Sequence, residues 1–246
     1  MKRYILSISV LVFVLSSCRY ETHRLNDFAV HGVDVSHYQS TVHWDSVAHQ
    51  SFHFAFVKAT EGESYVDSLF GNNWPEIRRV GMKRGAYHFF RPTLSAETQF
   101  ANFVRNVELL PGDLPPVLDV EVIDEATKVE LITRVRTWLY LTEIRYNIKP
   151  ILYSNQKFYN RYLAGHFDDY PVWIARYSSR KPELAYKRPW HFWQYGNKGK
   201  IAGVDGFVDF NVFGGSLLEL EQMCWMPDKV TAEDKRTAAL LVTEQK

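Results

Sequence analysis

Two carboxylates separated by a single residue follow a short apolar run, because Asp119 and Glu121 come directly after Val117 and Leu118. In a β-strand, residues two apart point to the same side, with Cα atoms about 6.5 to 7 Å apart. A negative neighbour and partial burial raise the pKa of a carboxyl group, which an acid catalyst near neutral pH requires. The pair by itself is equally compatible with two solvated carboxylates at the end of a strand.

Polar residues also stand at the ends of the other β-type runs. Asp34 closes the first run and Asp209 lies in the last. Between them come Lys58, Glu61, Tyr87, Tyr153, Trp193 and Gln194. In a parallel barrel the carboxyl ends of the strands share one rim, where barrel enzymes carry their active sites. Acids that converge without a matching basic cluster are electrostatically costly and are seldom kept for stability alone.

Two chemistries could use such a carboxylate cluster. Hydrolysis of a glycosidic bond needs one protonated and one ionised carboxyl group. A divalent metal site could use the same acids together with His37 or His88. The rim aromatics favour a sugar, because Tyr87, Tyr153 and Trp193 could stack on pyranose faces, although each ring could instead serve core packing. We therefore expect no metal and no cofactor.

The residues that could carry chemistry must be positioned by strands and helices that alternate from His31 to Phe213. Phe54, Phe56 and Lys58 alternate with Ala55, Val57 and Ala59, as a strand requires. We predict strands at 52–59, 86–90, 117–120, 151–154, 172–175, 191–194 and 207–210. Alternation of strands with helices predicts an α/β fold with a mostly parallel sheet, and about eight strands in one unit favour a closed barrel.

Helical patterns fill several of the intervals. Ser95 can cap a helix with apolar residues at 100, 103, 104 and 107. Leu131, Val135, Trp138 and Thr142 line one face of another helix, which Ile132 and Leu139 widen. A weaker pattern runs over 67–81, where Pro75 should break or kink a helix and Gly81 should end it. The last three strands lie too close together for full helices between them.

Composition excludes several classes of protein. The chain has 246 residues, with 46% hydrophobic and 23% charged, typical of a folded domain and not of a disordered or fibrous chain. Lys and Arg number 29 against 28 Asp and Glu, for a net charge of +1. The sequence has no run of basic residues of the kind that binds a phosphate backbone, so we expect no nucleic-acid partner.

The first residues predict export. Lys2 and Arg3 precede an apolar run over 5–15, which is too short to span a membrane and is typical of a secretory signal. Leu15-Ser16-Ser17-Cys18 resembles the bacterial lipoprotein signal, in which Cys18 is the lipidated residue; the alternative is an ordinary signal peptide. We expect a signal peptide at 1–17, a tether at 18–30, a catalytic barrel at 31–224 and a polar tail at 225–246. The protein would then be lipid-anchored in a bacterial cell envelope, on a periplasmic or outer-membrane face.

The ordered motifs resemble those of the glycoside hydrolase family 25 muramidases, the Chalaropsis-type lysozymes. The first is His31-Gly32-Val33-Asp34-Val35-Ser36-His37-Tyr38-Gln39, with Trp44 after it. Then come 56–62 (FVKATEG), 85–89 (GAYHF), 116–121 (PVLDVE), 153–155 (YSN), 193–195 (WQY) and 208–211 (VDFN). The resemblance covers about residues 31–214. It implies an irregular TIM-like β/α barrel of five β/α units followed by three strands.

The resemblance also implies cleavage of the β-1,4 bond between N-acetylmuramic acid and N-acetylglucosamine in peptidoglycan glycan strands. Glu121 would be the general acid/base, Asp119 would hold the substrate's N-acetyl group, and Asp34 and Asp209 would complete the carboxylate ring. Residues in contact with sugar would be Lys58, Glu61, Tyr87, Tyr153, Trp193 and Gln194. We expect a monomer that retains anomeric configuration by substrate-assisted catalysis. The alternatives are a non-catalytic carbohydrate-binding protein and a metal-dependent phosphodiesterase.

Overall fold

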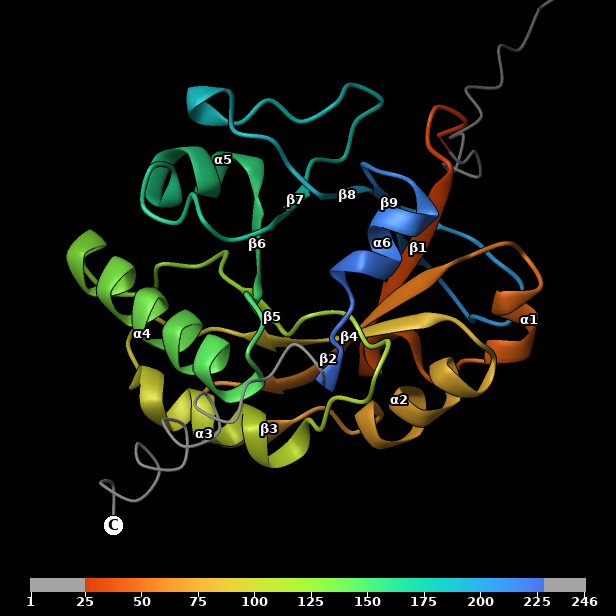
Figure 1. The fold of residues 1–246 in the computed structure, drawn as a ribbon, viewed down its shortest axis with the longest axis horizontal. Coiled ribbons are helices and arrows are strands. Elements are labelled where there is room, and N and C mark those ends of the chain that lie inside the picture. Colours follow the sequence, from red (N-terminus) through yellow and green to blue (C-terminus); the bar gives the residue numbers. More distant parts are fainter. Residues whose placement is uncertain (1–24, 228–246) are drawn as a thin grey trace, which may run out of the picture.

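Eight strands close into a barrel in the computed structural model, which describes residues 25–227 (Figure 1). In chain order they are β1 (Val30–Val35), β2 (Phe54–Glu61), β4 (Lys83–Phe89), β5 (Val117–Asp119), β6 (Ile151–Asn155), β7 (Val172–Ala175), β8 (Phe192–Gly199) and β9 (Val208–Phe213). A two-residue strand, β3 (Tyr65–Val66), pairs with the end of β2 outside the barrel. Pairing of β1 with both β2 and β9 closes the ring. The predicted barrel is confirmed.

A helix follows each of the first five barrel strands and covers the outside of the barrel. These helices are α1 (Trp44–Ala48), α2 (Phe70–Arg79), α3 (Ala96–Asn106), α4 (Lys128–Tyr146) and α5 (Gln156–Phe158), which continues into the π-helical turn Tyr159–Leu163. Strands β7, β8 and β9 then follow without a full helix between them, and α6 (Leu217–Met223) comes last. Short 3-10 turns occur at His37–Gln39 and Ala185–Lys187.

The strand directions explain how distant acids reach one rim. Strands β1, β2 and β4 to β8 run parallel, whereas β9 is antiparallel to both of its neighbours, β1 and β8. Asp209 was expected at the carboxyl end of the last strand. It lies instead near the start of β9. Because β9 is reversed, Asp209 still reaches the catalytic rim, where it lies directly opposite Asp34.

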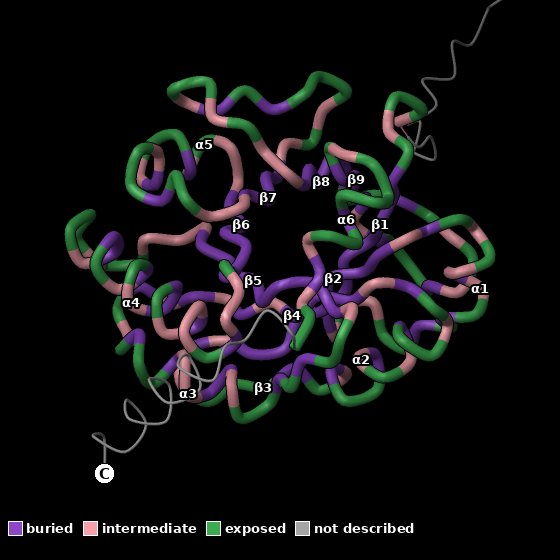
Figure 2. The backbone as a smooth tube through the Cα atoms, in the orientation of Figure 1, coloured by how far each residue is buried: buried purple, intermediate pink, exposed green. Residues whose placement is uncertain are grey.

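Alternation along the strands separates an inner core from an outer one. Phe54 and Phe56 point into the barrel with Phe192 and Trp173, and the Phe56 and Trp173 rings stack with centroids 4.3 Å apart. Ala55, Val57 and Ala59 face the helices instead, which confirms the predicted alternation. A Cβ atom added to Gly32 would lie 2.4 Å from the Phe54 ring, so only glycine fits beside it. The barrel floor is thus filled by aromatic rings, and Figure 2 shows the buried strands surrounded by exposed helices and loops.

Two of the helix predictions are confirmed, and the predicted effect of Pro75 is not. Ser95 caps α3 by accepting from the Thr98 amide, as predicted, and α4 buries the expected stripe of Leu131, Val135, Trp138 and Thr142 along with Ile132 and Leu139. The predicted break at Pro75 is wrong, because α2 continues through it to Arg79. Trp74, beside Pro75, packs on Phe70 with ring centroids 5.4 Å apart, and the Arg84 guanidinium lies over the Trp74 ring. These contacts favour the helix over the local preference of proline.

Residues at both ends of the described chain pack on the barrel. Phe28 contacts the rings of Trp190 and Trp193. Trp225 donates from Nε1 to the Tyr146 carbonyl at 2.7 Å, and Cys224 is buried with its thiol 3.4 Å from the Leu220 carbonyl. Cys18 and the predicted signal lie outside the described residues. Among residues 25–227, no helix is long and apolar enough to cross a membrane.

Candidate active site

A cleft of about 240 Å³ opens at the rim where the parallel strands end. Eight of the sequence-predicted site residues line it: Asp34, Lys58, Tyr87, Asp119, Glu121, Tyr153, Gln194 and Asp209. They come from strands throughout the barrel, and the closed sheet brings them together. Glu61 and Trp193 are not among the lining residues.

Amide side chains hold Asp34 in place at the bottom of the cleft. Its Oδ2 accepts from Gln194 Nε2 at 2.8 Å and from Asn211 Nδ2 at 2.6 Å. The Gln194 carbonyl in turn accepts from the hydroxyls of Tyr153 and Tyr177, at 2.9 and 3.1 Å. These hydroxyl groups fix which end of the Gln194 amide faces the acids. Asp34 is therefore held by the wall of the barrel and is suited to an indirect electrostatic role.

Asp34 and Asp209 lie opposite each other on β1 and β9, and the pKa of each is raised. Burial raises the pKa of Asp34 to about 6, although its hydrogen bonds from Gln194 and Asn211 oppose the shift. Burial and the negative charge of Asp34 raise the pKa of Asp209 to about 9. Asp209 is thus protonated at neutral pH and its carboxyl group hydrogen-bonds to Asp34. The pair carries about one negative charge, which lowers the cost of placing four acids in one cleft.

Asp119 and Glu121 form the second carboxyl pair. Burial first, and then the charge of Glu121, raise the pKa of Asp119 well above its ordinary value. The pKa of Glu121 is raised by burial and by the charge of Asp34, while Lys58 opposes the shift. Asp119 Oδ1 is buried and has no hydrogen-bond partner within the described residues. A buried carboxylate oxygen without a donor is costly, so this atom is placed to receive one from a bound molecule.

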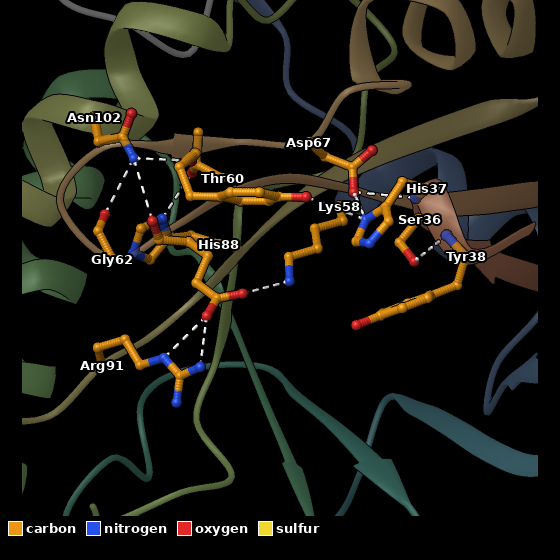
Figure 3. A network of polar contacts seen from close by, with 12 residues as sticks. Ser36, His37, Tyr38, Lys58, Thr60, Gly62, Asp67, His88, Arg91 and Asn102 are labelled. Atoms are coloured by element: carbon orange, nitrogen blue, oxygen red, sulfur yellow. Dashed lines mark hydrogen bonds and ion pairs between the residues drawn. The ribbon is translucent and has the colours of Figure 1, made fainter. Parts of the chain in front are cut away.

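Lys58 enters the cleft as part of a chain of ion pairs (Figure 3). Its Nζ donates to Glu61 Oε2 at 2.6 Å, and Arg91 Nη2 donates to Glu61 Oε1 at 2.6 Å. Burial acts to raise the pKa of Glu61, but the hydrogen bonds from Lys58 and Arg91 hold it below its usual value. Glu61 therefore stays ionised and positions Lys58. The expectation that Glu61 itself contacts sugar is corrected, because Glu61 does not line the cleft and its two oxygens accept from Lys58 and Arg91.

Trp193 also departs from the sequence-based expectation. Its side chain is fully buried in the layer between barrel and outer shell, and its Nε1 donates to the Arg176 carbonyl at 2.9 Å. Neighbouring Gln194 points into the cleft, so Trp193 must point away. A direct sugar contact by Trp193 is therefore wrong.

Four aromatic residues of the cleft lining were not predicted as site residues: Tyr38, Phe89, Trp173 and Tyr177. Phe89 ends β4, two residues after the predicted Tyr87. Trp173 lies in β7 and Tyr177 in the segment after it, and no acid or amide marks the end of this strand in the sequence. Tyr38 lies in the first motif, and its side chain is 79% exposed at the edge of the cleft. Trp173 could have been found from strand alternation, because alternate residues of β7 point into the barrel. Tyr177 could have been found from its position just after the end of that strand.

The two histidines considered as metal ligands have other partners. His37 Nδ1 lies 2.7 Å from Asp67 Oδ2. His88 is buried between Thr60 and Gln99, and burial lowers its pKa to about 4, which keeps it neutral. Within residues 25–227, no three His, Cys, Asp or Glu side chains are arranged to hold a metal ion. Amide side chains donate to two acids of the cleft, from Gln194 to Asp34 and Asp209 and from Asn211 to Asp34.

The raised pKa values predict how stability depends on pH. An acid whose pKa is higher in the folded state stabilises the fold below its unfolded pKa of about 4, and this contribution is lost as pH rises through the folded value. For Asp34 and Asp209 the folded values are about 6 and about 9. We expect the melting temperature to fall between pH 5 and pH 9. Asp209→Asn should reduce this fall, so that the difference in Tm between variant and parent grows with pH. An unchanged difference from pH 6 to pH 9 would show that Asp209 is ionised throughout.

Comparison with known proteins places this arrangement in a family. Residues 33–204 match the model of the glycosyl hydrolases family 25. The chain belongs to glycosyl hydrolase family 25. It is 43% identical to the protein YegX of Escherichia coli K12 over 199 residues, which is 79% of this chain and 73% of that protein. Lysozyme M1 of Streptomyces globisporus is 34% identical over 78% of this chain and 70% of its own length.

The solved structures agree with this family assignment. A family 25 glycosyl hydrolase from Bacillus anthracis superposes with a TM-score of 0.79 at 35% identity, covering 84% of this chain and 98% of that one. This family 25 chain is therefore a glycoside hydrolase on a TIM-like barrel. The carboxyl pairs described above are the groups at its rim that can exchange protons with a glycosidic bond.

Proposed function

We propose that this hydrolase is a muramidase, which cleaves the β-1,4 bond between N-acetylmuramic acid and N-acetylglucosamine in peptidoglycan. The observation that carries the proposal is the pairing of Glu121, a carboxyl group with a raised pKa at the cleft, with the unpartnered Oδ1 of Asp119. An acid and an acceptor for an N-acetyl N–H are the two groups that substrate-assisted hydrolysis of a 2-acetamido sugar uses. Similarity to Lysozyme M1 supports the same substrate.

The two residues divide the chemistry of the bond between them. Glu121 protonates the leaving oxygen while the acetamido oxygen of the substrate attacks C1 and forms an oxazoline intermediate. Asp119 accepts from the acetamido N–H, and its negative charge stabilises the positive charge that develops there. Glu121, now ionised, then removes a proton from water, which opens the intermediate at C1 with overall retention. Tyr87 and Tyr153, whose pKa values burial raises well above the ordinary value, stay protonated and can donate to sugar oxygens.

Digestion of purified cell wall tests the proposed function. Mass spectrometry of the products should show soluble fragments with N-acetylmuramic acid at the reducing end. Fragments with N-acetylglucosamine at the reducing end would indicate the other glycosidic bond. Binding without release of fragments would favour the non-catalytic carbohydrate-binding protein. Activity abolished by a chelator would favour the metal-dependent phosphodiesterase.

The envelope location is a further part of the proposal. The sequence Leu15-Ser16-Ser17-Cys18 supports lipidation at Cys18 and anchorage in a bacterial envelope, which would hold the enzyme near its polymeric substrate.

Substitution of Cys18 tests the anchor. One acyl chain binds a membrane only marginally, whereas several give stable attachment, so loss of the modified cysteine should release the protein. We expect Cys18→Ser to abolish labelling with a radioactive or clickable fatty acid and to leave either soluble protein or an uncleaved precursor. Cys224→Ser is the matched control, because Cys224 is buried in the folded unit. A Cys18→Ser protein that is still labelled and fractionates with membranes would contradict lipidation at this site.

A further inference from the structure

A second cavity continues from the catalytic cleft, on the far side of Glu121. It measures about 620 Å³ and is lined by Glu121 and Tyr177, which it shares with the cleft, and by Asn155, Gln156, Lys157, Ala175 and Arg176. These residues follow β6 and β7 at the catalytic rim. A molecule bound at Glu121 can therefore extend into this cavity without leaving the surface of the barrel.

The two cations of the cavity lack acidic partners. Within residues 25–227, neither Lys157 nor Arg176 takes part in an ion pair. Glu121 lines the same cavity but forms no ion pair with either cation. The catalytic cleft thus carries a cluster of acids, and the cavity beside it carries unpaired positive charge.

Arg176 is held in a fixed position. Its Nη1 donates to the Lys181 carbonyl at 2.9 Å and to Gln156 Oε1 at 3.3 Å, which leaves Nε and Nη2 without a protein acceptor in the described part of the chain. A guanidinium group anchored through one nitrogen presents the others as a fork that matches a carboxylate. Lys157 is exposed on the opposite wall, at the start of α5.

The connection between β7 and β8 adds positive charge and is itself fixed. Residues 176–190 contain Arg176, Arg180, Lys181, Lys187 and Arg188 against a single acid, Glu183. Asn160 joins this connection to the turn after α5, because its side chain donates to the Glu183 carbonyl and accepts from the Ala185 amide. Figure 1 shows the connection arching beside α5. The cavity therefore has two braced walls, as a preformed binding site requires.

We propose that this cavity binds the carboxylates of the stem peptides that branch from N-acetylmuramic acid, with Arg176 and Lys157 as the recognising residues. The inference rests on the proposed muramidase function. Where a stem peptide is attached, the lactyl carboxyl group of N-acetylmuramic acid is an amide, so the sugar backbone itself is neutral and gives no reason for two unpaired cations. A peptide ends in a carboxylate, and the sugar that bears it would lie next to Glu121. The enzyme thus prefers glycan strands that still carry anionic peptides over strands whose peptides are neutral.

The test compares two substrates that differ only in charge. Soluble glycan strands with intact stem peptides are used as they are, or after carbodiimide coupling of the peptide carboxylates to methylamine. We expect Lys157→Glu and Arg176→Gln in the full-length protein each to lower kcat/KM about tenfold on intact strands, the range expected for loss of a charge-assisted hydrogen bond. On amidated strands the parent should slow to a similar degree, and the variants should match the parent.

Lys149→Glu is the matched control. Lys149 is an exposed lysine just before β6, at the opposite rim, so its reversal makes the same change in net charge as Lys157→Glu but far from the cavity. It should leave both rates unchanged. Variants that discriminate between the two substrates as the parent does would overturn the inference. So would equal losses on both substrates, because the cations would then act on glycan or on the fold. Absence of muramidase products from the parent on either substrate would instead overturn the proposed function and this inference with it.

Discussion

Glu121→Gln is expected to reduce the rate of peptidoglycan cleavage by about 10²- to 10⁴-fold, the range contributed by a positioned acid/base. Glutamine keeps the shape of the side chain but has no proton to give to the leaving oxygen. Glu121 is partly exposed at the cleft and carries a raised pKa, so the loss of a charge there should not destabilise the fold. Release of reducing ends from purified cell wall measures the rate, and sedimentation with insoluble wall measures binding, which should persist.

A nearby carboxyl group provides the control for this prediction. Glu125 is exposed and lies four positions farther along the same loop, so Glu125→Gln removes an equal charge without touching the cleft. It should retain the parental rate. Asp34→Asn should be intermediate, because Asp34 acts through its hydrogen bonds with Gln194 and Asn211. A near-parental rate for Glu121→Gln would assign the acid role to Asp209 or Asp34 instead.

Local patterns predicted the barrel well because it is built from regular alternation. Val172–Ala175 is a strand over the expected residues, and the stripe of α4 is buried as its spacing indicated. Each of these features depends on which side of one element faces the core, a property that the periodicity of the sequence encodes directly. Pro75 shows the limit, because the Arg84 guanidinium that covers the neighbouring Trp74 ring comes from another element, β4, and local patterns do not report such a contact.

The residue types of the candidate site could be predicted from the sequence, but not always the face of the strand on which each side chain lies. Trp193 and Gln194 are neighbours in one motif. Adjacent residues of a strand point to opposite faces, so one of them faces the cleft and the other faces the outer layer. Only the inward placement of Phe192, fixed by its contacts with Phe54 and Phe56, determines that Gln194 faces the acids. The role of Glu61 is tertiary in the same way, since Arg91 reaches it from another strand end. The reversed direction of β9, which brings Asp209 to Asp34, also depends on how the ring closes.

Asp119→Asn should lower the rate by about 10²- to 10³-fold, the range found when one group that stabilises transition-state charge is removed. Asp119 is buried, and its Oδ1 has no donor within the described residues. A substrate N–H would supply that donor and favour the ionised form of Asp119. The negative charge of Asp119 would then raise the pKa of Glu121 further and favour a proton on Glu121, where the leaving oxygen needs it. Asparagine keeps a hydrogen-bonding group but cannot balance the positive charge that develops on the acetamido group.

The anomer of the first product and the search for a covalent adduct test this division of roles. Attack by the acetamido oxygen followed by water gives two inversions at C1, so NMR at early times should show the β-anomer from the parent enzyme. Treatment with a 2-fluoro sugar should leave no ester on the protein, because that sugar lacks the acetamido nucleophile. Initial release of the α-anomer would exclude retention. An adduct on Asp119 or Asp209 would make that aspartate the nucleophile, and the muramidase assignment would stand while the substrate-assisted step would not.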